Sequence, residues 1–210
     1  MDAFKTFTGT VAVLERANVD TDQIIPKQFL KSIERTGFGP ALFFDWRYLK
    51  DGSPNPEFEL NDAERQGASI LVAGNNFGCG SSREHAVWAV QQYGFRAVIA
   101  PWRGEGDKRI PGFADIFKNN SYGNGLLPIE LASDEVQWIF DEAKGCKLEA
   151  TVDLVAQTVT VRGAQERLFR FEITSDVKEK LMGGLDAIGV TLAHEAEITV
   201  FEATHDVQMA

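Results

Sequence analysis

The chain has 210 residues, of which 44% are hydrophobic, 10% aromatic and 25% charged. This composition is typical of a globular protein and excludes a disordered, collagen-like or coiled-coil chain. The 21 basic and 31 acidic residues give a net charge of -10, which argues against a general nucleic-acid-binding protein.

The cysteines and the apolar runs bear on metal binding and on cellular location. Cys79 and Cys146 lie far apart, whereas an iron–sulphur cluster or structural zinc site needs three or four ligands close together, so no metal site is expected in this chain. Residues 1–5 lack the features of a secretion signal, and the longest apolar runs are far shorter than the roughly 20 residues of a membrane span. The sequence therefore predicts a cytoplasmic protein with no membrane partner.

The first part of the chain is predicted to form a strand, a short helix and a long loop. Residues 4–14 are rich in β-branched and aromatic side chains, which favour a strand. After a polar turn at residues 18–22, Pro26 suits the first position of a short helix through Ser32. The loop near residues 36–60 contains Pro, Gly and aromatic residues, and we expect it to be a partly ordered surface loop. It is either functional or pads the core with its aromatics.

A βαβ unit with two parallel strands is predicted next. The first strand is expected at 68–73 and a glycine-rich turn at 74–80. The helix follows at 82–93 and the second strand at 95–100. Gly94 suits the end of the helix. Ser81 and Glu84 have the spacing of a capping box, which predicts Ser81 as the helix N-cap.

The second half of the chain alternates loops, strands and helices. We expect a glycine-rich loop at 103–109, a short helix at 113–117 and an extended segment at 126–129. A second helix is predicted at 134–143, followed by three strands at 148–155, 158–161 and 168–173. The C-terminal part, 175–202, is helical with a break at Gly183 and Gly184. Because no repeat or linker divides the sequence, we expect one α/β domain over residues 1–210 with a mixed sheet.

The turn between the first βαβ strand and its helix carries the candidate chemistry. Residues 74–86 read Gly-Asn-Asn-Phe-Gly-Cys-Gly-Ser-Ser-Arg-Glu-His-Ala. Glycines let a backbone approach a ligand closely, and a helix N-terminus attracts carboxylates and phosphates. Arg83 adds a cation whose planar fork matches a carboxylate. These features predict an anion site.

The same turn can be compared with nucleotide-binding, nucleophilic and purely structural motifs. A P-loop needs a Lys after its last glycine, and a dinucleotide fingerprint needs Gly where Arg83 stands. Cys79 near the helix N-terminus, with His85 close in sequence, leaves open a thiol nucleophile with a lowered pKa. A structural role also stays open, in which the serines cap the helix and Arg83 pairs with an acid.

Four motifs give the sequence a family resemblance. Gly-Ser-Ser-Arg-Glu-His-Ala at 80–86 resembles the signature of the swivelling domain of the aconitase superfamily, and 75–80 resembles the form in small subunits of 3-isopropylmalate dehydratase. Three further segments agree with that family in the expected order, at 20–26, 113–128 and 184–192. The resemblance spans nearly the whole chain.

The resemblance implies an α/β swivelling domain of three layers, β/β/α, that works beside a separate large subunit. That partner carries a [4Fe–4S] cluster whose open iron binds the substrate. The implied reaction converts 2-isopropylmalate to 3-isopropylmalate by loss and re-addition of water, a step of leucine biosynthesis. Its substrate is a small hydroxy-dicarboxylate.

The same resemblance implies roles for four residues. Ser81 is expected to be the catalytic base, acting as an alkoxide that the helix N-terminus and nearby cation stabilise. Arg83 is expected to bind a substrate carboxylate, supported by a hydrogen bond from Ser82. Asp22 matches the position of an acidic active-site residue in the superfamily and is expected to contact the substrate.

Two departures from the family pattern leave the substrate open. An inserted loop near residues 102–112 brings in Arg103, Lys108 and Arg109, and Ser-Tyr-Gly stands at 121–123 where the family often has Cys-Phe-Lys. One alternative is therefore a related dehydratase that acts on methylmalate, citraconate or homocitrate. An alternative of another class is a non-catalytic regulatory module that binds an anion.

Overall fold

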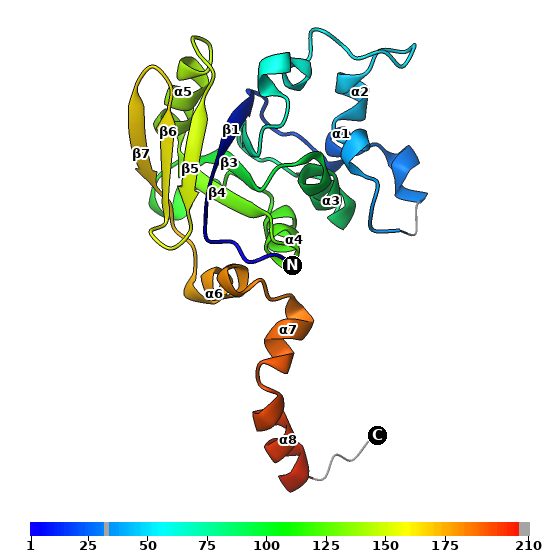
Figure 1. The fold of residues 1–210 in the computed structure, drawn as a ribbon, viewed down its shortest axis with the longest axis vertical. Helices are drawn as coiled ribbons and strands as arrows, with labels where there is room; N and C mark the ends of the chain where they lie inside the picture. The colour runs from blue at the N-terminus through cyan, green and yellow to red at the C-terminus, as the bar shows by residue number, and fades with distance from the viewer. Residues whose placement is uncertain (32–33, 206–210) are drawn as a thin grey trace.

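The computed structural model of the chain describes residues 1–31 and 34–205, which form a mixed α/β fold (Figure 1). The strands are β1 Thr6–Leu14, β2 Ile70–Ala73, β3 Ala97–Trp102, β4 Leu127–Ala132, β5 Glu149–Asp153, β6 Thr158–Arg162 and β7 Glu166–Arg170. The α-helices are α1 Thr21–Ile24, α2 Phe44–Arg47, α3 Glu84–Tyr93, α4 Asp115–Asn124, α5 Ser133–Glu142, α6 Ser175–Gly183, α7 Ala187–Leu192 and α8 Glu195–Thr204. Short 3-10 helices lie at Lys27–Lys31, Gly39–Ala41, Glu59–Asn61, Ala63–Arg65 and Gly106–Lys108.

The seven strands form a mixed sheet in the order β4-β3-β2-β1-β5-β6-β7. Strands β1 to β4 pair in parallel, whereas β1, β5, β6 and β7 pair antiparallel. Strand β1 serves both halves, because Thr6 to Thr10 pair with β5 and Val11 to Leu14 pair with β2. The parallel half and the antiparallel half of the sheet therefore meet at β1.

Alternation along the buried strands separates two hydrophobic cores. In β2, Leu71 and Ala73 belong to a core with the buried residues of α3, whereas Ile70 and Val72 belong to a core with β5 to β7 and α5. Successive strand side chains point to opposite faces, so one buried strand contributes to both cores. The antiparallel half, the parallel half and the helices beside α3 are thus the three expected layers, and the predicted β/β/α architecture is confirmed.

The predicted βαβ unit and the later hairpin are confirmed. Strands β2 and β3 pair in parallel, and α3 connects them and ends at Gly94. Strands β5 and β6 form the hairpin. The third antiparallel strand covers 166–170 rather than 168–173, because β7 pairs with β6 from Arg162 opposite Glu166 to Thr158 opposite Arg170. The C-terminal helices are also confirmed, with a left-handed Gly184 at the predicted break.

Two expectations for residues 18–60 are corrected. The polar turn contains one helical turn, α1, because Asp20 caps it and exchanges hydrogen bonds with Gln23. After Pro26 the chain forms a 3-10 helix, and the predicted end at Ser32 lies outside the described residues. The segment 36–60 is only partly a surface loop, because it contains α2 and two 3-10 helices and buries Phe43 completely. Its aromatics do pad the core.

Helix α4 is longer than the predicted helix at 113–117. It continues to Asn124, the Ser121 hydroxyl donates to the Phe117 carbonyl oxygen within it, and Gly125 in a left-handed conformation ends it. The preceding loop is closed by backbone hydrogen bonds between Arg103 and Ile110. Over the described part of the chain, no helix has both the length and the apolar character that a membrane span requires.

Candidate functional site

The turn that follows β2 is held from one side by the chain after β1. The Gly78 amide donates to the Val19 carbonyl oxygen at 2.8 Å, and the Thr21 amide donates to that of Cys79 at 2.9 Å. These bonds place α1 beside the turn. Motifs separated by about sixty positions in the sequence therefore form one site.

The chain before α4 holds the other side of the turn. The Phe77 amide donates to the Gly112 carbonyl oxygen at 2.9 Å, and the Ala114 amide donates back to Phe77 at 3.1 Å. Gly78 and Gly80 have φ values of +76° and +91°, which L side chains rarely adopt. A Cβ at Gly78 would also collide with the ring of Phe117. The turn thus requires glycine for both conformation and packing.

The capping-box prediction for Ser81 is wrong. Helix α3 begins at Glu84, and its N-cap is Arg83, whose side chain makes no capping hydrogen bond. Ser81 belongs to a tight turn before the helix, in which the Arg83 amide bonds the Ser81 carbonyl oxygen at 2.8 Å. Ser81 and Ser82 are both exposed. Their hydroxyl groups are therefore accessible to a ligand or partner rather than used as caps.

Arg83 pairs with Asp22, so the structure brings together all four predicted site residues. Arg83 Nη1 donates to Asp22 Oδ1, and Lys27 Nζ lies 3.6 Å from Asp22 Oδ2. The hydrogen bond from Arg83 lowers the pKa of Asp22 below its usual value, against the opposing effect of burial. The Arg83 side chain is 18% exposed and that of Asp22 is 43% exposed. The site is a surface cluster of two cations, one carboxylate and two hydroxyls.

The geometry does not support Cys79 as a nucleophile. Burial raises the pKa of its thiol, and the charge of Asp20 raises it further, whereas a reactive thiol needs a lowered pKa. His85 points into an aromatic cluster, where its ring centroid is 4.7 Å from that of Trp88 and 5.3 Å from that of Phe38. His85, the base considered for a catalytic cysteine, therefore packs against Phe38 and Trp88.

Glu130, a partly buried carboxylate that the motifs did not reveal, is hydrogen-bonded to the chain that holds the turn. Glu130 Oε1 accepts the Gly112 amide at 2.6 Å, and its Oε2 accepts Lys118 Nζ at 2.7 Å. The Glu130 side chain is only 14% exposed. Because Gly112 in turn bonds Phe77, Glu130 is connected to the site turn through a single backbone segment. An isolated acidic residue in a strand gives no sequence signal for such a role.

The start of α3 is fixed by a second group outside the predicted site. The Asn124 side-chain amide donates to Glu84 Oε1 at 2.8 Å, and Trp88 Nε1 donates to Asn124 Oδ1 at 3.0 Å. Asn124 is the last residue of α4, so this side chain joins the end of one helix to the first turn of the other. It lies within a motif of the family resemblance, but spacing alone indicates no contact with Glu84.

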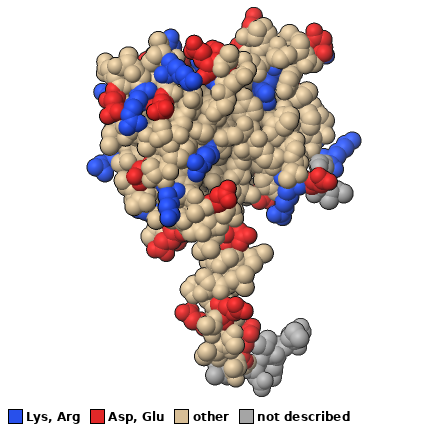
Figure 2. Space-filling model, in the orientation of Figure 1, with Lys and Arg blue, Asp and Glu red and all other residues tan. Residues whose placement is uncertain are grey.

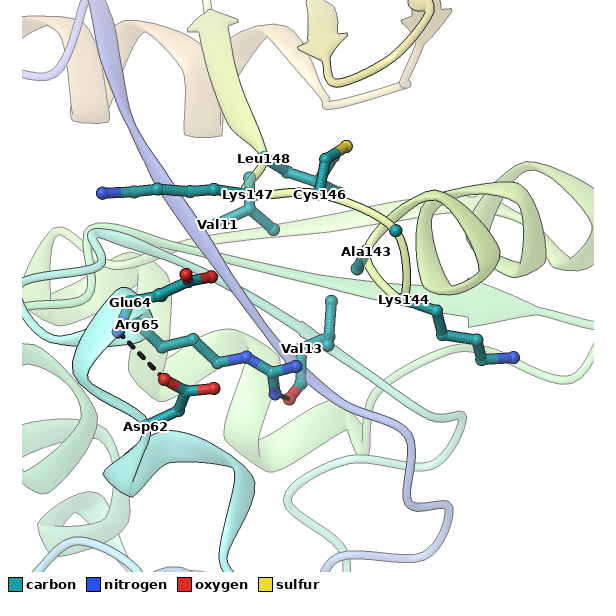
Figure 3. Close-up of a pocket in the computed structure, with 11 residues that line it drawn as sticks. Val11, Val13, Asp62, Glu64, Arg65, Ala143, Lys144, Cys146, Lys147 and Leu148 are labelled. Carbon is teal, nitrogen blue, oxygen red and sulfur yellow. Dashed lines mark hydrogen bonds between the residues drawn. The ribbon is translucent and has the colours of Figure 1, made fainter.

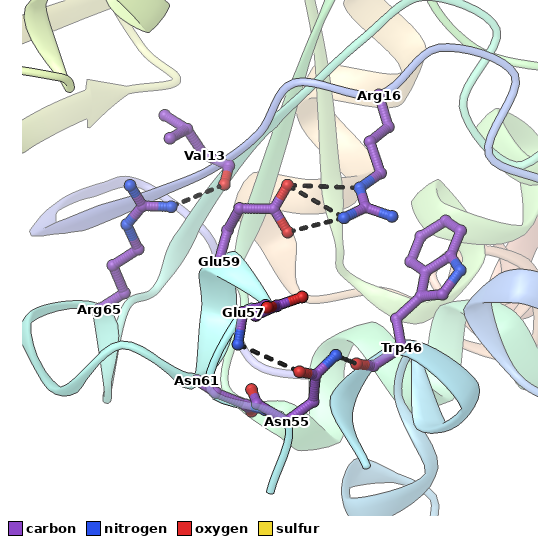
Figure 4. Close-up of polar contacts among 8 residues, drawn as sticks. All are labelled: Val13, Arg16, Trp46, Asn55, Glu57, Glu59, Asn61 and Arg65. Atoms are coloured by element: carbon purple, nitrogen blue, oxygen red, sulfur yellow. Dashed lines mark hydrogen bonds and ion pairs between the residues drawn. The ribbon is translucent and has the colours of Figure 1, made fainter. Parts of the chain in front are cut away.

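Arg16 anchors the segment that contains α2 beside the site. Figure 4 shows its guanidinium paired with Glu59, with Nη2 and Oε2 3.0 Å apart. The same guanidinium lies 4.6 Å from the centroid of the Trp46 ring. Its backbone carbonyl oxygen accepts the amide of Gly74, the first residue of the turn. Arg16 thus fixes both the turn and the segment beside it.

A cavity of about 260 Å³ lies away from the turn, between β1 and the loop after α5. Val11 and Val13 line one wall, and Asp62 and Arg65 line another (Figure 3). Its lining includes none of the predicted site residues. The described residues also contain no group of three or more His, Cys, Asp or Glu side chains placed to hold a metal ion.

Comparison with known proteins gives consistent relatives. A model of the aconitase C-terminal domain family matches residues 1–134. The 3-isopropylmalate dehydratase small subunit of Desulforapulum autotrophicum is 55% identical over 97% of this chain and 95% of its own length. That of Halalkalibacterium halodurans is 54% identical over 97% of this chain and 99% of its own. A crystal structure of 3-isopropylmalate dehydratase from Methanocaldococcus jannaschii matches with a TM-score of 0.64 and 23% identity, covering 93% of this chain and 98% of that one, which speaks to the fold alone.

Proposed function

Since this chain belongs to the aconitase C-terminal domain family and to its branch of 3-isopropylmalate dehydratase small subunits, we propose that it is the small subunit of a heteromeric hydro-lyase. The enzyme isomerises 2-isopropylmalate to 3-isopropylmalate by dehydration and rehydration in leucine biosynthesis. The observation that carries this proposal is the surface cluster around Arg83, whose exposed serines need a second surface to enclose a substrate.

The partner is a large subunit that carries a [4Fe–4S] cluster. The proposal of this cluster rests on the membership of the chain in the aconitase C-terminal domain family. In the assembled enzyme the cluster supplies a Lewis acid for the departing hydroxyl group. The remaining tasks, proton transfer and orientation of the carboxylates, fall to side chains such as those on the turn of this chain.

Ser81 is proposed to take the proton from the substrate carbon. A serine hydroxyl is a weak base at neutral pH, so its alkoxide needs stabilisation by positive charge. Arg83 is two positions away, and the N-terminus of α3 begins at Glu84, so both a cation and a helix dipole lie close to Ser81. Closure of the large subunit over the exposed turn would strengthen both effects by excluding water.

Arg83 is proposed to bind a substrate carboxylate, with Ser82 adding a hydrogen bond and Asp22 orienting the arginine. An arginine side chain has five N–H donors in a planar fork, so the bond from Nη1 to Asp22 leaves donors for a substrate. Lys27 lies 3.6 Å from the other oxygen of Asp22, so this carboxylate sits between two cations. The arrangement preorganises a cation at a fixed position, which lowers the entropic cost of binding.

The test is hydration of isopropylmaleate, followed by loss of its ultraviolet absorbance. The chain is mixed anaerobically with a large subunit reconstituted with its cluster, and the expected result is turnover that requires both subunits. If the complex turns over only citraconate or homoaconitate, the proposal of a dehydratase stands and the proposed substrate is wrong. A chain that binds no large subunit would contradict the proposal and favour the regulatory module.

A further inference from the structure

The last two helices extend away from the rest of the fold. Helices α7 and α8 form an arm, residues 187–204, that projects from the body below α6 (Figure 1). Every residue from 190 to 203 is exposed. The base of the arm is fixed, because the Phe4 amide donates to the Leu181 carbonyl oxygen at 2.9 Å and the N-terminal ammonium donates to that of Gly184 at 3.3 Å.

The arm exposes apolar side chains that a solvated helix does not need. Ile188, Leu192, Val200 and Phe201 are 69%, 59%, 67% and 57% exposed. Phe201 stacks on His205 at the end of α8 and still keeps this exposure. Helices of 6 and 10 residues are too short to be stable in water without tertiary packing. Burial of these exposed side chains against a partner surface would therefore stabilise the arm.

The charges around the apolar residues define that surface. At 100° per residue, Ile198 and Phe201 lie about 60° apart on α8, with Glu197 on one side of them and Glu195 and Glu202 on the other, whereas Val200 lies on the opposite face. Lys180 is the last lysine or arginine of the sequence. Figure 2 accordingly shows Asp or Glu and no Lys or Arg on the visible face of the arm. A complementary partner presents an apolar groove with Lys or Arg at its rim.

The base of the arm and the first residue of α3 line the same cavity. A cavity of about 400 Å³ is lined by Asp186 and Ile188 from the start of the arm and by Glu84, the first residue of α3. Arg35 and Asn124 also line it. A surface that covers the Ser81 turn can therefore continue onto the arm without crossing the body of the protein.

From these observations we infer that the arm docks onto the large subunit, in an apolar groove rimmed by basic residues; this rests on the proposed function. A second copy of the chain is a poorer occupant, because two copies that each carry a net charge of -10 repel each other. The arm thus extends the interface that the exposed serine turn begins.

The test uses the full chain and a matched pair of substitutions. Phe201→Asp changes the arm, and Leu168→Asp changes an apolar side chain of β7 that is equally exposed, at 57%. Binding to the large subunit is measured by titration calorimetry, with circular dichroism to show that both variants are folded. Phe201→Asp and Ile198→Asp should weaken binding by about tenfold or more, and Leu168→Asp by less than about twofold. Glu202→Lys should weaken binding more at low salt than at high salt.

The outcomes separate the docking from the chemistry. If wild-type protein and large subunit hydrate isopropylmaleate and Phe201→Asp binds as tightly as wild type, the function stands and the docking is overturned. If wild type binds and the arm variants weaken binding but no substrate turns over, the docking stands and the function fails. A chain that is dimeric alone, and monomeric as Phe201→Asp, would overturn the docking in favour of a second copy. Absence of any complex would overturn both.

Discussion

Arg83 and Asp22, 61 positions apart in the sequence, form an ion pair in which the arginine Nη1 donates to the aspartate Oδ1. The pair joins the serine turn to α1, so two separate motifs lie together in the candidate site. A substrate carboxylate would meet an arginine that is already held in position, because Asp22 orients it. The strength of this pair can be measured through the ionisation of Asp22.

Replacement of Arg83 by Gln should raise the pKa of Asp22 towards the ordinary value. The Arg83 hydrogen bond is the largest effect that lowers this pKa, so its loss leaves the raising effect of burial opposed only by Lys27. A lowered pKa stabilises the fold above the unfolded value of about 3.9, and this contribution is lost as pH falls through the folded value. Carbon-13 NMR titration of the Asp22 carboxyl measures the shift. Lys27→Gln is the control, and an equal or larger shift in that variant would contradict the assignment.

Substitution of Ser81 by Ala should abolish most turnover while the complex still forms. Loss of a catalytic base lowers kcat by about a hundred- to ten-thousandfold. Ser82→Ala, an equally small change at the next position, should lower kcat/KM by about tenfold or less, because it removes one hydrogen bond. Both serines are exposed, so the free energy of unfolding should change by less than about 0.5 kcal/mol. Equal losses in the two variants would argue against Ser81 as the base.

Replacement of Gly78 by Ala should destabilise the protein and distort the turn. The residue has φ +76°, and an added Cβ collides with Phe117, so we expect a loss of about 1–3 kcal/mol in the free energy of unfolding. Gly123→Ala is the matched control, because Gly123 lies within α4 and a Cβ there meets nothing within 4 Å. That variant should be more stable by up to about 1 kcal/mol. Urea denaturation of both variants measures the difference.

Glu130 should act as a positioning residue for the serine turn. Glu130→Leu removes the acceptor for the Gly112 amide, whereas Glu130→Gln keeps an oxygen there and loses only the charge paired with Lys118. We expect Glu130→Leu to lower kcat by about tenfold or more, because small displacements of a site are costly, and Glu130→Gln to restore most of it. Hydrogen exchange should show faster exchange of the Gly112 and Phe77 amides in Glu130→Leu alone. Equal effects in both variants would indicate that only the ion pair matters.

Cys79 should be dispensable for catalysis and slow to react. Burial and the charge of Asp20 raise the pKa of its thiol, so the reactive thiolate is scarcer at neutral pH than in an ordinary cysteine. Cys79→Ala should keep turnover within about threefold of wild type, since no step depends on the thiol. Iodoacetamide labelling at pH 7, followed by mass spectrometry, should modify Cys79 more slowly than glutathione. Loss of turnover in Cys79→Ala with intact folding would revive the thiol nucleophile.

The sequence alone predicted the elements whose signals are local. Alternating or continuous apolar residues indicated β1, the βαβ unit and the antiparallel hairpin, and Gly184 indicated the break in the C-terminal helices. The motif around Ser81 also indicated the family, because four ordered segments carry more information than one. These predictions succeeded because each depends on neighbouring residues and on the periods of the strand and the helix.

Tertiary structure alone decided the features that join distant residues. Local spacing predicted Ser81 as a helix cap, but the turn is held by the chain after β1 and by the chain before α4, and the helix starts at Glu84. Phe43 is buried within a segment whose composition indicates a surface loop. The contact of Glu130 with Gly112 has no sequence signature. Such contacts depend on the order of strands in the sheet, which brings together residues that no local pattern relates.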